Sequence, residues 1–216
     1  MTSNKEDYLK AIYKLGGLHK TISNKSISEA LNISPASVTE MLQKLSGEGL
    51  IIYRAYKGST LTEKGLQAVL TLVRGHRLWE VFLIRHLGYS SSEAHEDAEL
   101  LEHVAPKRLI DKLDLFLNYP QTCPHGNLIP DSNNKVQELN LVLLSSLNIN
   151  DEGIIKIFDE NKKNLDYLEK KNININDSFK IIDLDKSKIT LEINNNLKTI
   201  DSDFSSLIFV EKKEIK

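Results

Sequence analysis

Cysteine is almost absent from this chain, because Cys123 is the only one among 216 residues. A single thiol excludes an internal disulfide framework, and it favours a cytoplasmic protein. Long apolar runs are lacking too, since no stretch approaches the roughly 18 apolar residues of a membrane helix. The N-terminus is charged at Lys5, Glu6, Asp7 and Lys10, so it lacks the apolar core of a signal peptide. We therefore expect a cytoplasmic protein with no membrane partner.

Enzyme motifs are missing as well. The chain has no HExxH motif, no glycine-rich phosphate loop and no nucleophile with a paired base. A metal-dependent hydrolase, with Glu99 or Glu102 as general base beside a metal-bound water, is therefore the least favoured interpretation. We predict a protein that is not an enzyme and has no small organic substrate.

The net charge of -2 gives no global sign of a nucleic-acid partner. The charge is uneven, however. Residues 1–73 hold nine Lys or Arg and six Asp or Glu, whereas the rest of the chain holds 19 and 24. A mildly basic N-terminal part precedes an acidic body, so nucleic-acid contacts are expected in the N-terminal part.

Two helices are predicted at the start of the chain. Apolar side chains at helical spacing indicate a helix over residues 4–15, with Asn4 as its N-cap. A shorter helix is predicted over residues 26–31, opened by Ser26.

A third helix and a hairpin complete this pattern. Ser34 followed by Pro35 predicts the cap and first position of a helix that ends near Gly47. Residues 50–54 and 60–62 flank a turn and predict two paired strands. A helix-turn-helix followed by such a hairpin is a winged helix.

The exposed side chains of the third helix are small or polar, which suits a helix that reads base edges in the major groove. Basic residues of the hairpin would contact phosphates. The expected DNA-binding residues are Ser34, Ala36, Ser37, Thr39, Gln43, Lys44, Arg54 and Lys57. Winged helices also serve as protein-interaction modules, which is the alternative.

The middle of the chain predicts further helices over residues 63–87, over residues 91–104 and from Pro106 onward. These helices carry more apolar surface than a monomer of this size readily buries. We expect a homodimer that buries it.

One stretch of this region concentrates metal-binding side chains. At helical spacing His95, Glu99, Glu102 and His103 share one face, which holds no Lys or Arg. Imidazoles and carboxylates are donors that divalent cations prefer. A solvated acidic helix face is the alternative.

Residues 119–135 break every periodic pattern and indicate an ordered loop or linker. Cys123 and His125 lie two residues apart there, so in an extended segment both side chains would point the same way. Beyond residue 140, short alternating runs predict four or five strands of a small β-barrel. The predicted strands are residues 153–160, 179–185, 188–193 and 206–213.

The whole chain resembles a known family. The winged helix, His76-Arg77-Leu78-x-Glu80, the stretch from His95 to His103, the loop CPHGNLIP and a small barrel follow one another as in the diphtheria-toxin-repressor family of metal-dependent regulators. The manganese-sensing branch is the most similar.

This resemblance implies a fold that is mainly α with small β modules. The expected domains are a winged helix-turn-helix DNA-binding domain (1–72), a helical metal-binding and dimerisation domain (73–140) and an SH3-like β-barrel (141–216).

The resemblance also implies a primary metal site formed by Asp7, Glu99, Glu102 and His103. Iron-sensing members have Met and Cys in place of Asp7 and Glu99, and hard carboxylates suit Mn²⁺ better than soft sulfur does. Mn²⁺ is therefore the expected ion, and Fe²⁺, Co²⁺, Cd²⁺ or Zn²⁺ are expected to bind in vitro.

A secondary site is implied as well. Its expected donors are His76, Glu80, His95, Cys123 and His125, together with either Asp159 or Glu160. Some short manganese sensors bind two adjacent ions through a Glu at the position of Lys10. An ammonium there disfavours the second ion, so two separated sites are expected.

The function implied is a Mn²⁺-dependent repressor of metal-uptake genes that binds operator DNA as a homodimer. The alternative is a winged-helix regulator that senses an organic ligand or a protein partner without metal.

Overall fold

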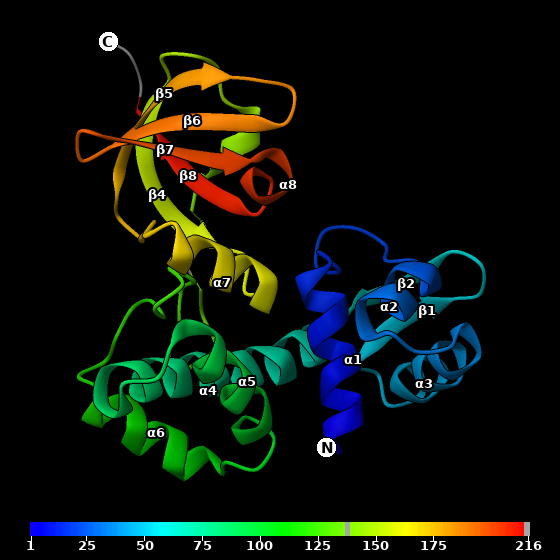
Figure 1. Cartoon of the computed structure of the whole chain (residues 1–216). Coiled ribbons are helices and arrows are strands. Elements are labelled where there is room, and N and C mark those ends of the chain that lie inside the picture. Colours follow the sequence, from blue (N-terminus) through cyan, green and yellow to red (C-terminus); the bar gives the residue numbers. More distant parts are fainter. Residues whose placement is uncertain (137–138, 214–216) are drawn as a thin grey trace. The chain divides into compact units, whose positions relative to one another are not determined.

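The computed structural model describes residues 1–136 and 139–213 (Figure 1). The chain divides into two compact units. The first comprises Met1–His76, Leu100–Ile110 and Pro130–Lys135, and the second comprises Arg77–Glu99, Asp111–Ile129 and Val136–Lys216.

The N-terminal part of the first unit is a winged helix. Its elements are α1 (Ser3–Lys14), α2 (Asn24–Leu31), α3 (Pro35–Gly47), β1 (Ile51–Arg54) and β2 (Gly58–Leu61). The strands β1 and β2 are antiparallel, and Ile22 forms a further bridge to Ser59 of β2. Apolar residues from all three helices and the hairpin, among them Ile12, Ile27 and Leu42, form one buried core.

The predicted start of α3 is confirmed. Ser34 is the N-cap, its side chain accepts a hydrogen bond from the backbone N–H of Ser37 (3.2 Å), and Pro35 takes the first helical position. This cap fixes where the exposed face of the helix begins.

Two other predicted helix starts are wrong. Asn4 lies inside α1, which Thr2 precedes without a side-chain cap bond. The cap of α2 is Ser23, whose Oγ accepts from the backbone N–H of Ser26 at 3.0 Å. A serine lies at each end of the segment Ser23–Ser26, and the sequence pattern alone favoured the wrong one.

Three helices connect the winged helix to the rest of the chain. They are α4 (Glu63–Leu87), α5 (Ser91–Leu101) and α6 (Lys107–Phe116). Each of them begins in one unit and ends in the other. The predicted bounds of α4 are confirmed, whereas α5 ends three residues earlier than expected, so that Glu102 and His103 lie in the turn that follows it.

The C-terminal part of the second unit is a six-stranded antiparallel sheet with the order β3-β8-β4-β5-β6-β7, drawn in Figure 1. The elements are β3 (Val142–Leu143), η1 (Leu144–Ser146), β4 (Glu152–Phe158), α7 (Lys162–Lys170), β5 (Ser178–Leu184), β6 (Lys188–Ile193), β7 (Asn196–Asp201), α8 (Ser202–Ser205) and β8 (Ile208–Lys212). Register shifts in the β4–β8 and β5–β6 pairs mark two bulges, which bend the strands. The buried side chains of this sheet, including Ile155, Ile181 and Leu191, form a second core.

The predicted strands correspond to β4, β5, β6 and β8, whereas β3, η1, α7, β7 and α8 were not predicted. The asparagine-rich segment after β4 forms α7, in which Asn161 caps the backbone N–H of Asn164 and Leu165 and Leu168 are buried. The polar segment 196–201 forms β7, paired along β6.

The overall class, mainly α with small β modules, is confirmed by these elements. No helix among the described residues is long and apolar enough to cross a membrane. The division into three domains with the expected bounds stays a prediction.

Candidate metal centres

The first cluster of metal-binding side chains lies in the first unit, where α1 meets the turn after α5. One ligand atom from each of Asp7, Glu102 and His103 lies within 4.8 Å of the others. His103 Nε2 is 3.0 Å from Oδ1 of Asp7 and 3.6 Å from Oε1 of Glu102. Two carboxylates and an imidazole thus converge in a space that suits a small divalent cation.

A residue that the sequence interpretation missed orients His103. Oε2 of Glu6 lies 2.7 Å from His103 Nδ1, the ring nitrogen opposite the one that faces Asp7 and Glu102. A neutral imidazole has one N–H, so it can donate to Glu6 or to Asp7 but not to both. When Nδ1 donates to Glu6, Nε2 presents its lone pair to the cluster, which is the arrangement of a metal-binding histidine.

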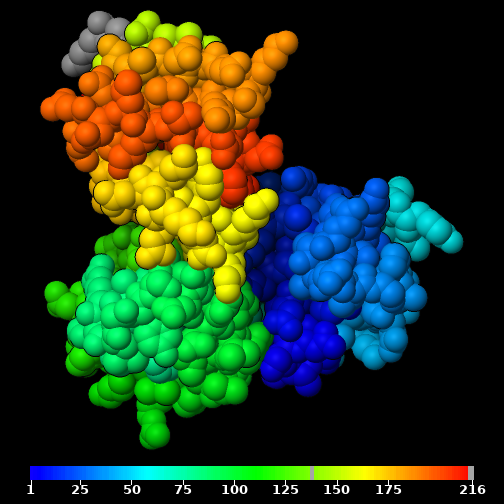
Figure 2. All heavy atoms as spheres, in the orientation of Figure 1, coloured from blue at the N-terminus to red at the C-terminus, as the bar shows by residue number. Residues whose placement is uncertain are grey.

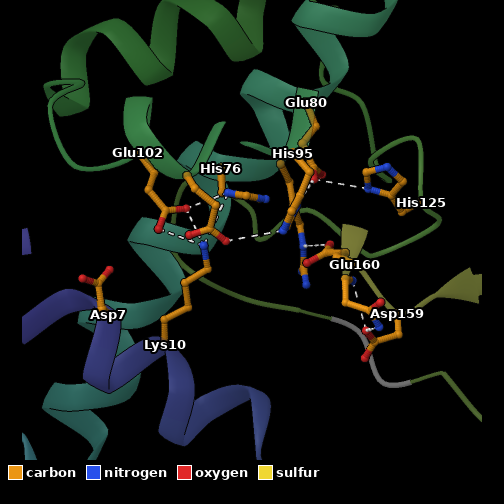
Figure 3. A network of polar contacts seen from close by, with 12 residues as sticks. Asp7, Lys10, His76, Glu80, His95, Glu102, His125, Asp159 and Glu160 are labelled. Carbon is orange, nitrogen blue, oxygen red and sulfur yellow. Dashed lines mark hydrogen bonds and ion pairs between the residues drawn. The ribbon is translucent and has the colours of Figure 1, made fainter. Parts of the chain in front are cut away.

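Glu102 is the most enclosed member of this cluster, with no exposed side-chain surface. Figure 3 shows the Lys10 side chain rising from α1 to its carboxylate. Lys10 Nζ donates to both carboxylate oxygens at 2.8 and 2.7 Å, and His76 Nδ1 lies 2.7 Å from Oε2. His76 was expected in the secondary site, but within the first unit its ring contacts Glu102.

The cluster opens on one side into a cavity of about 180 Å³. Glu6, Glu102 and His103 line one wall of this cavity, and Arg74 and Lys107 contribute basic side chains. A cation in this cavity can therefore reach His103, whose side chain is partly exposed, whereas Glu102 is enclosed behind it.

Glu99 belongs to the second unit, where its Oε1 lies 3.5 Å from Nε2 of His95. Its expected place beside Asp7, Glu102 and His103 stays a prediction.

The second cluster lies wholly in the second unit and consists of buried side chains. Ligand atoms of Glu80, Cys123, His125 and Glu160 all lie within 4.8 Å of one another. Nδ1 of His125 is 3.2 Å from Oε1 of Glu80, and Sγ of Cys123 is 3.9 Å from both His125 Nδ1 and Glu160 Oε1. The helix α4, the loop 119–129 and the segment that follows β4 each supply donors to this cluster.

A turn brings Cys123 and His125 together, so the expectation of an extended segment is wrong. The backbone N–H of Gly126 donates to the carbonyl of Cys123 (2.9 Å), which closes the turn over Pro124. Gly126 has a φ of +84°, and a Cβ there would lie 1.7 Å from the carbonyl oxygen of Lys156. Only glycine fits, because the loop packs directly on β4.

The chemistry of these donors fits a soft or borderline divalent cation. Burial raises the pKa of the Cys123 thiol well above its usual range, and the carboxylates of Glu80 and Glu160 raise it further. The thiol is therefore protonated at neutral pH until a cation offsets the two negative charges. Nε2 of His125 is buried and has no hydrogen-bond partner among the described residues, which supports a fit to a metal ion.

Neighbouring side chains hold this cluster in place. Asn127 donates to Oε1 of Glu160 at 2.8 Å, and Arg77 lies 3.8 Å from the same oxygen. His95 Nδ1 is 2.9 Å from Glu80 Oε1. Sequence reasoning did not single out Arg77 or Asn127 as part of this site.

The structure distinguishes the two carboxylates at the end of β4. Glu160 is buried in the cluster, whereas Asp159 is exposed and accepts a hydrogen bond from the backbone N–H of Asn161 at 3.1 Å. Figure 3 shows the two side chains side by side.

The predicted DNA-binding residues lie on α3 and on the wing. Ser34, Ala36, Ser37, Gln43, Lys44, Arg54 and Lys57 are all exposed. Thr39 is half-buried. Its hydroxyl donates to the carbonyl of Pro35 and accepts from the side-chain amide of Asn24, so this hydroxyl already has two partners within the winged helix. The wing tip, in cyan, projects from the first unit in Figure 2.

Two family models match this chain. Residues 1–59 match the model of the iron dependent repressor N-terminal DNA binding domain, and residues 62–131 match that of the iron dependent repressor metal binding and dimerisation domain. The HTH-type transcriptional regulator MntR of Lysinibacillus sphaericus is 38% identical over 112 residues, which cover 52% of this chain and 80% of that protein.

Solved structures are similar over nearly the whole chain. The manganese regulator SloR has a TM-score of 0.81 and 38% identity, and the match covers 99% of this chain and 100% of that one. ScaR, solved with bound Zn²⁺, has a TM-score of 0.84 and 37% identity over 96% of this chain and 99% of that one.

Proposed function

Because the chain belongs to the iron-dependent repressor family and is a metal-dependent DNA-binding transcriptional regulator, we propose that its effector is Mn²⁺ and that it represses genes of metal uptake. The family consists of transcriptional regulators and not of enzymes, so a hydrolase is no longer a candidate. The C-terminal six-stranded sheet is its SH3-like domain.

The donor set of the first cluster supports Mn²⁺ as the effector. Asp7 and Glu102 offer hard oxygen donors and His103 offers one nitrogen, with no sulfur among them. When bound, the ion supplies positive charge that holds these three side chains together. Relatives with manganese in their names, such as the manganese regulator SloR, support the same choice.

The position of these donors suggests how the signal reaches DNA. Asp7 is on α1 of the winged helix, whereas Glu102 and His103 follow α5 and precede α6. These residues would hold the ion between α1 and that turn, and the orientation of the DNA-binding head would then be fixed. Two heads of a homodimer bind a palindromic operator only when their recognition helices are about 34 Å apart or a multiple of it.

The second cluster supports a further, separate metal site. Its donors include Cys123 and lie in the second unit, so it does not share a side chain with the trio Asp7, Glu102 and His103. The thiolate favours softer ions than the first cluster does. We propose that this site stabilises the loop 119–129 against β4.

DNA, a second copy of the chain and a divalent metal are thus the proposed partners. We propose that the protein acts in the cytoplasm, as a DNA-binding regulator of this family.

The test is a selection of bound sequences from a pool of random duplex DNA, carried out with Mn²⁺ and repeated with a chelator. We expect enrichment of a palindromic sequence with Mn²⁺ alone. Asp7→Ala should lose this enrichment, while Glu29→Ala, at an exposed carboxylate of α2, should retain it. Equal enrichment in chelator would instead favour a regulator that senses an organic ligand or a protein partner.

A further inference from the structure

The ammonium group of Lys10 is buried next to a carboxylate of the first cluster. Its side chain is 6% exposed, and that of its partner Glu102 is 0% exposed. The ammonium lies within 2.8 Å of both oxygens of this carboxylate. Such a contact is much stronger than one between exposed residues, because little water screens it.

The contact satisfies Glu102 when no metal is bound. A buried carboxylate without a nearby positive charge is strongly destabilising. Here the carboxylate receives two hydrogen bonds from Lys10 and a contact from Nδ1 of His76. The negative charge of Glu102 is therefore balanced by Lys10 when the first cluster holds no metal.

The same contact opposes metal binding. Oε1 of Glu102 faces His103 at 3.6 Å, so it is the oxygen best placed to join His103 and Asp7 around an ion. Lys10 donates a hydrogen bond to that oxygen, and this bond must break before the oxygen can bind an ion. Lys10 would then retain only its bond to Oε2, which also contacts His76. A divalent cation and an ammonium that share one carboxylate also repel each other at short range.

We propose that Lys10 is a built-in counter-ion of Glu102, which competes with the incoming metal ion and so sets the metal concentration at which the first cluster fills. The inference rests on the proposed metal-binding function of that cluster. It adds a residue that is not itself a metal ligand but determines the sensing threshold.

The experiment compares Lys10→Met, Lys10→Gln and Lys10→Arg in full-length protein that also carries His125→Ala, so that only the first cluster binds tightly. Competition with a fluorescent chelator gives the Mn²⁺ dissociation constant of each variant. We expect Lys10→Met and Lys10→Gln to bind Mn²⁺ about ten- to a hundred-fold more tightly, and Lys10→Arg to bind like the parent or more weakly. Lys14→Met, one turn further along α1 and exposed, is the control and should change nothing.

A second readout follows the metal-free protein. Removal of the counter-ion should lower the melting temperature of metal-free Lys10→Met, and Mn²⁺ should raise it by more than it does in the parent. If metal-free Lys10→Met does not fold, Lys10→Gln decides the matter, because its amide still donates to Glu102. Unchanged or weaker Mn²⁺ affinity in the folded neutral variants would overturn the proposal.

The titration contains no DNA, so its outcome is separate from that of the proposed function. Absence of Mn²⁺ binding by the parent would count against the function. Binding by the parent with equal affinity in Lys10→Met and Lys10→Gln would count against the role of Lys10 alone.

Discussion

Glu6 and His103 are 97 residues apart in the sequence, yet Oε2 of Glu6 lies 2.7 Å from Nδ1 of His103. This contact fixes which face of the imidazole ring is turned to Asp7 and Glu102.

Glu6→Ala should weaken Mn²⁺ binding to the first cluster about ten- to a hundred-fold without removing any ligand, because His103 loses the partner that orients its ring. Calorimetric titration of the variant measures the change. Glu63→Ala, at an exposed carboxylate of α4, serves as the control and should bind as the parent does. A Glu6→Ala protein with full affinity would show that His103 needs no such support.

Binding of a thiophilic ion such as Cd²⁺ at the second cluster should release about one proton from Cys123 at neutral pH, since burial keeps the thiol protonated in the metal-free protein. The observed binding enthalpy should then vary with the ionisation enthalpy of the buffer. In Cys123→Ser this dependence should be smaller by one proton. Equal proton release by both proteins would exclude a thiolate ligand.

Phe116→Glu should convert the proposed homodimer into a monomer. Phe116 is 61% exposed at the end of α6, and its ring lies 5.0 Å from that of His86 and 6.1 Å from that of Phe82, so an aromatic cluster faces outward. A charge there makes burial in an interface unfavourable. Sedimentation equilibrium would reveal the change.

Leu197→Glu is the matched control for this prediction, because Leu197 is a similarly exposed apolar residue (69%) on β7 of the sheet. It should leave the oligomeric state unchanged. A dimeric Phe116→Glu protein, or a monomeric Leu197→Glu protein, would place the interface elsewhere.

Asp151 should contribute to stability at neutral pH but not in acid. A hydrogen bond from the backbone N–H of Asn148 lowers the pKa of this carboxyl, and the Lys212 ammonium lowers it further. A lowered pKa in the folded state gives stability that is complete above the unfolded value of about 3.9 and disappears as the pH falls through the folded value. Asp151→Asn should therefore destabilise the protein at pH 7, and the difference should shrink below about pH 4. Urea unfolding of the two metal-free proteins across this range would test it, and a constant difference would contradict it.

Of the three helix caps predicted from local sequence signals, only that of α3 is confirmed. The pair Ser34-Pro35 identified the start of α3, because a capping side chain and a fixed φ act within one turn. The helix α7 (Lys162–Lys170) was not predicted, because its largely charged composition hides the buried pair Leu165 and Leu168. Its helical form depends on packing against the sheet, which no local pattern expresses.

In the candidate sites too, contacts between residues far apart in the sequence were not predicted from the sequence alone. Asp7, Glu102 and His103 were grouped through the family resemblance, and the structure brings them together. Glu6 was missed because adjacent helical residues usually point in directions about 100° apart, so its neighbour Asp7 seemed the sole contact. The two nitrogens of one imidazole ring reach both carboxylates, and only the folded structure reveals this.

The ion pair between Lys10 and Glu102 also bears on how the protein endures metal starvation. A chelator removes exogenous ions from the first cluster, but it cannot remove an ammonium that is part of the polypeptide. Many small metal-binding domains unfold when the metal is removed, because metal binding supplies their folding free energy. In this chain the Lys10 ammonium remains beside the Glu102 carboxylate, so we expect the metal-free protein to stay folded and able to bind metal again.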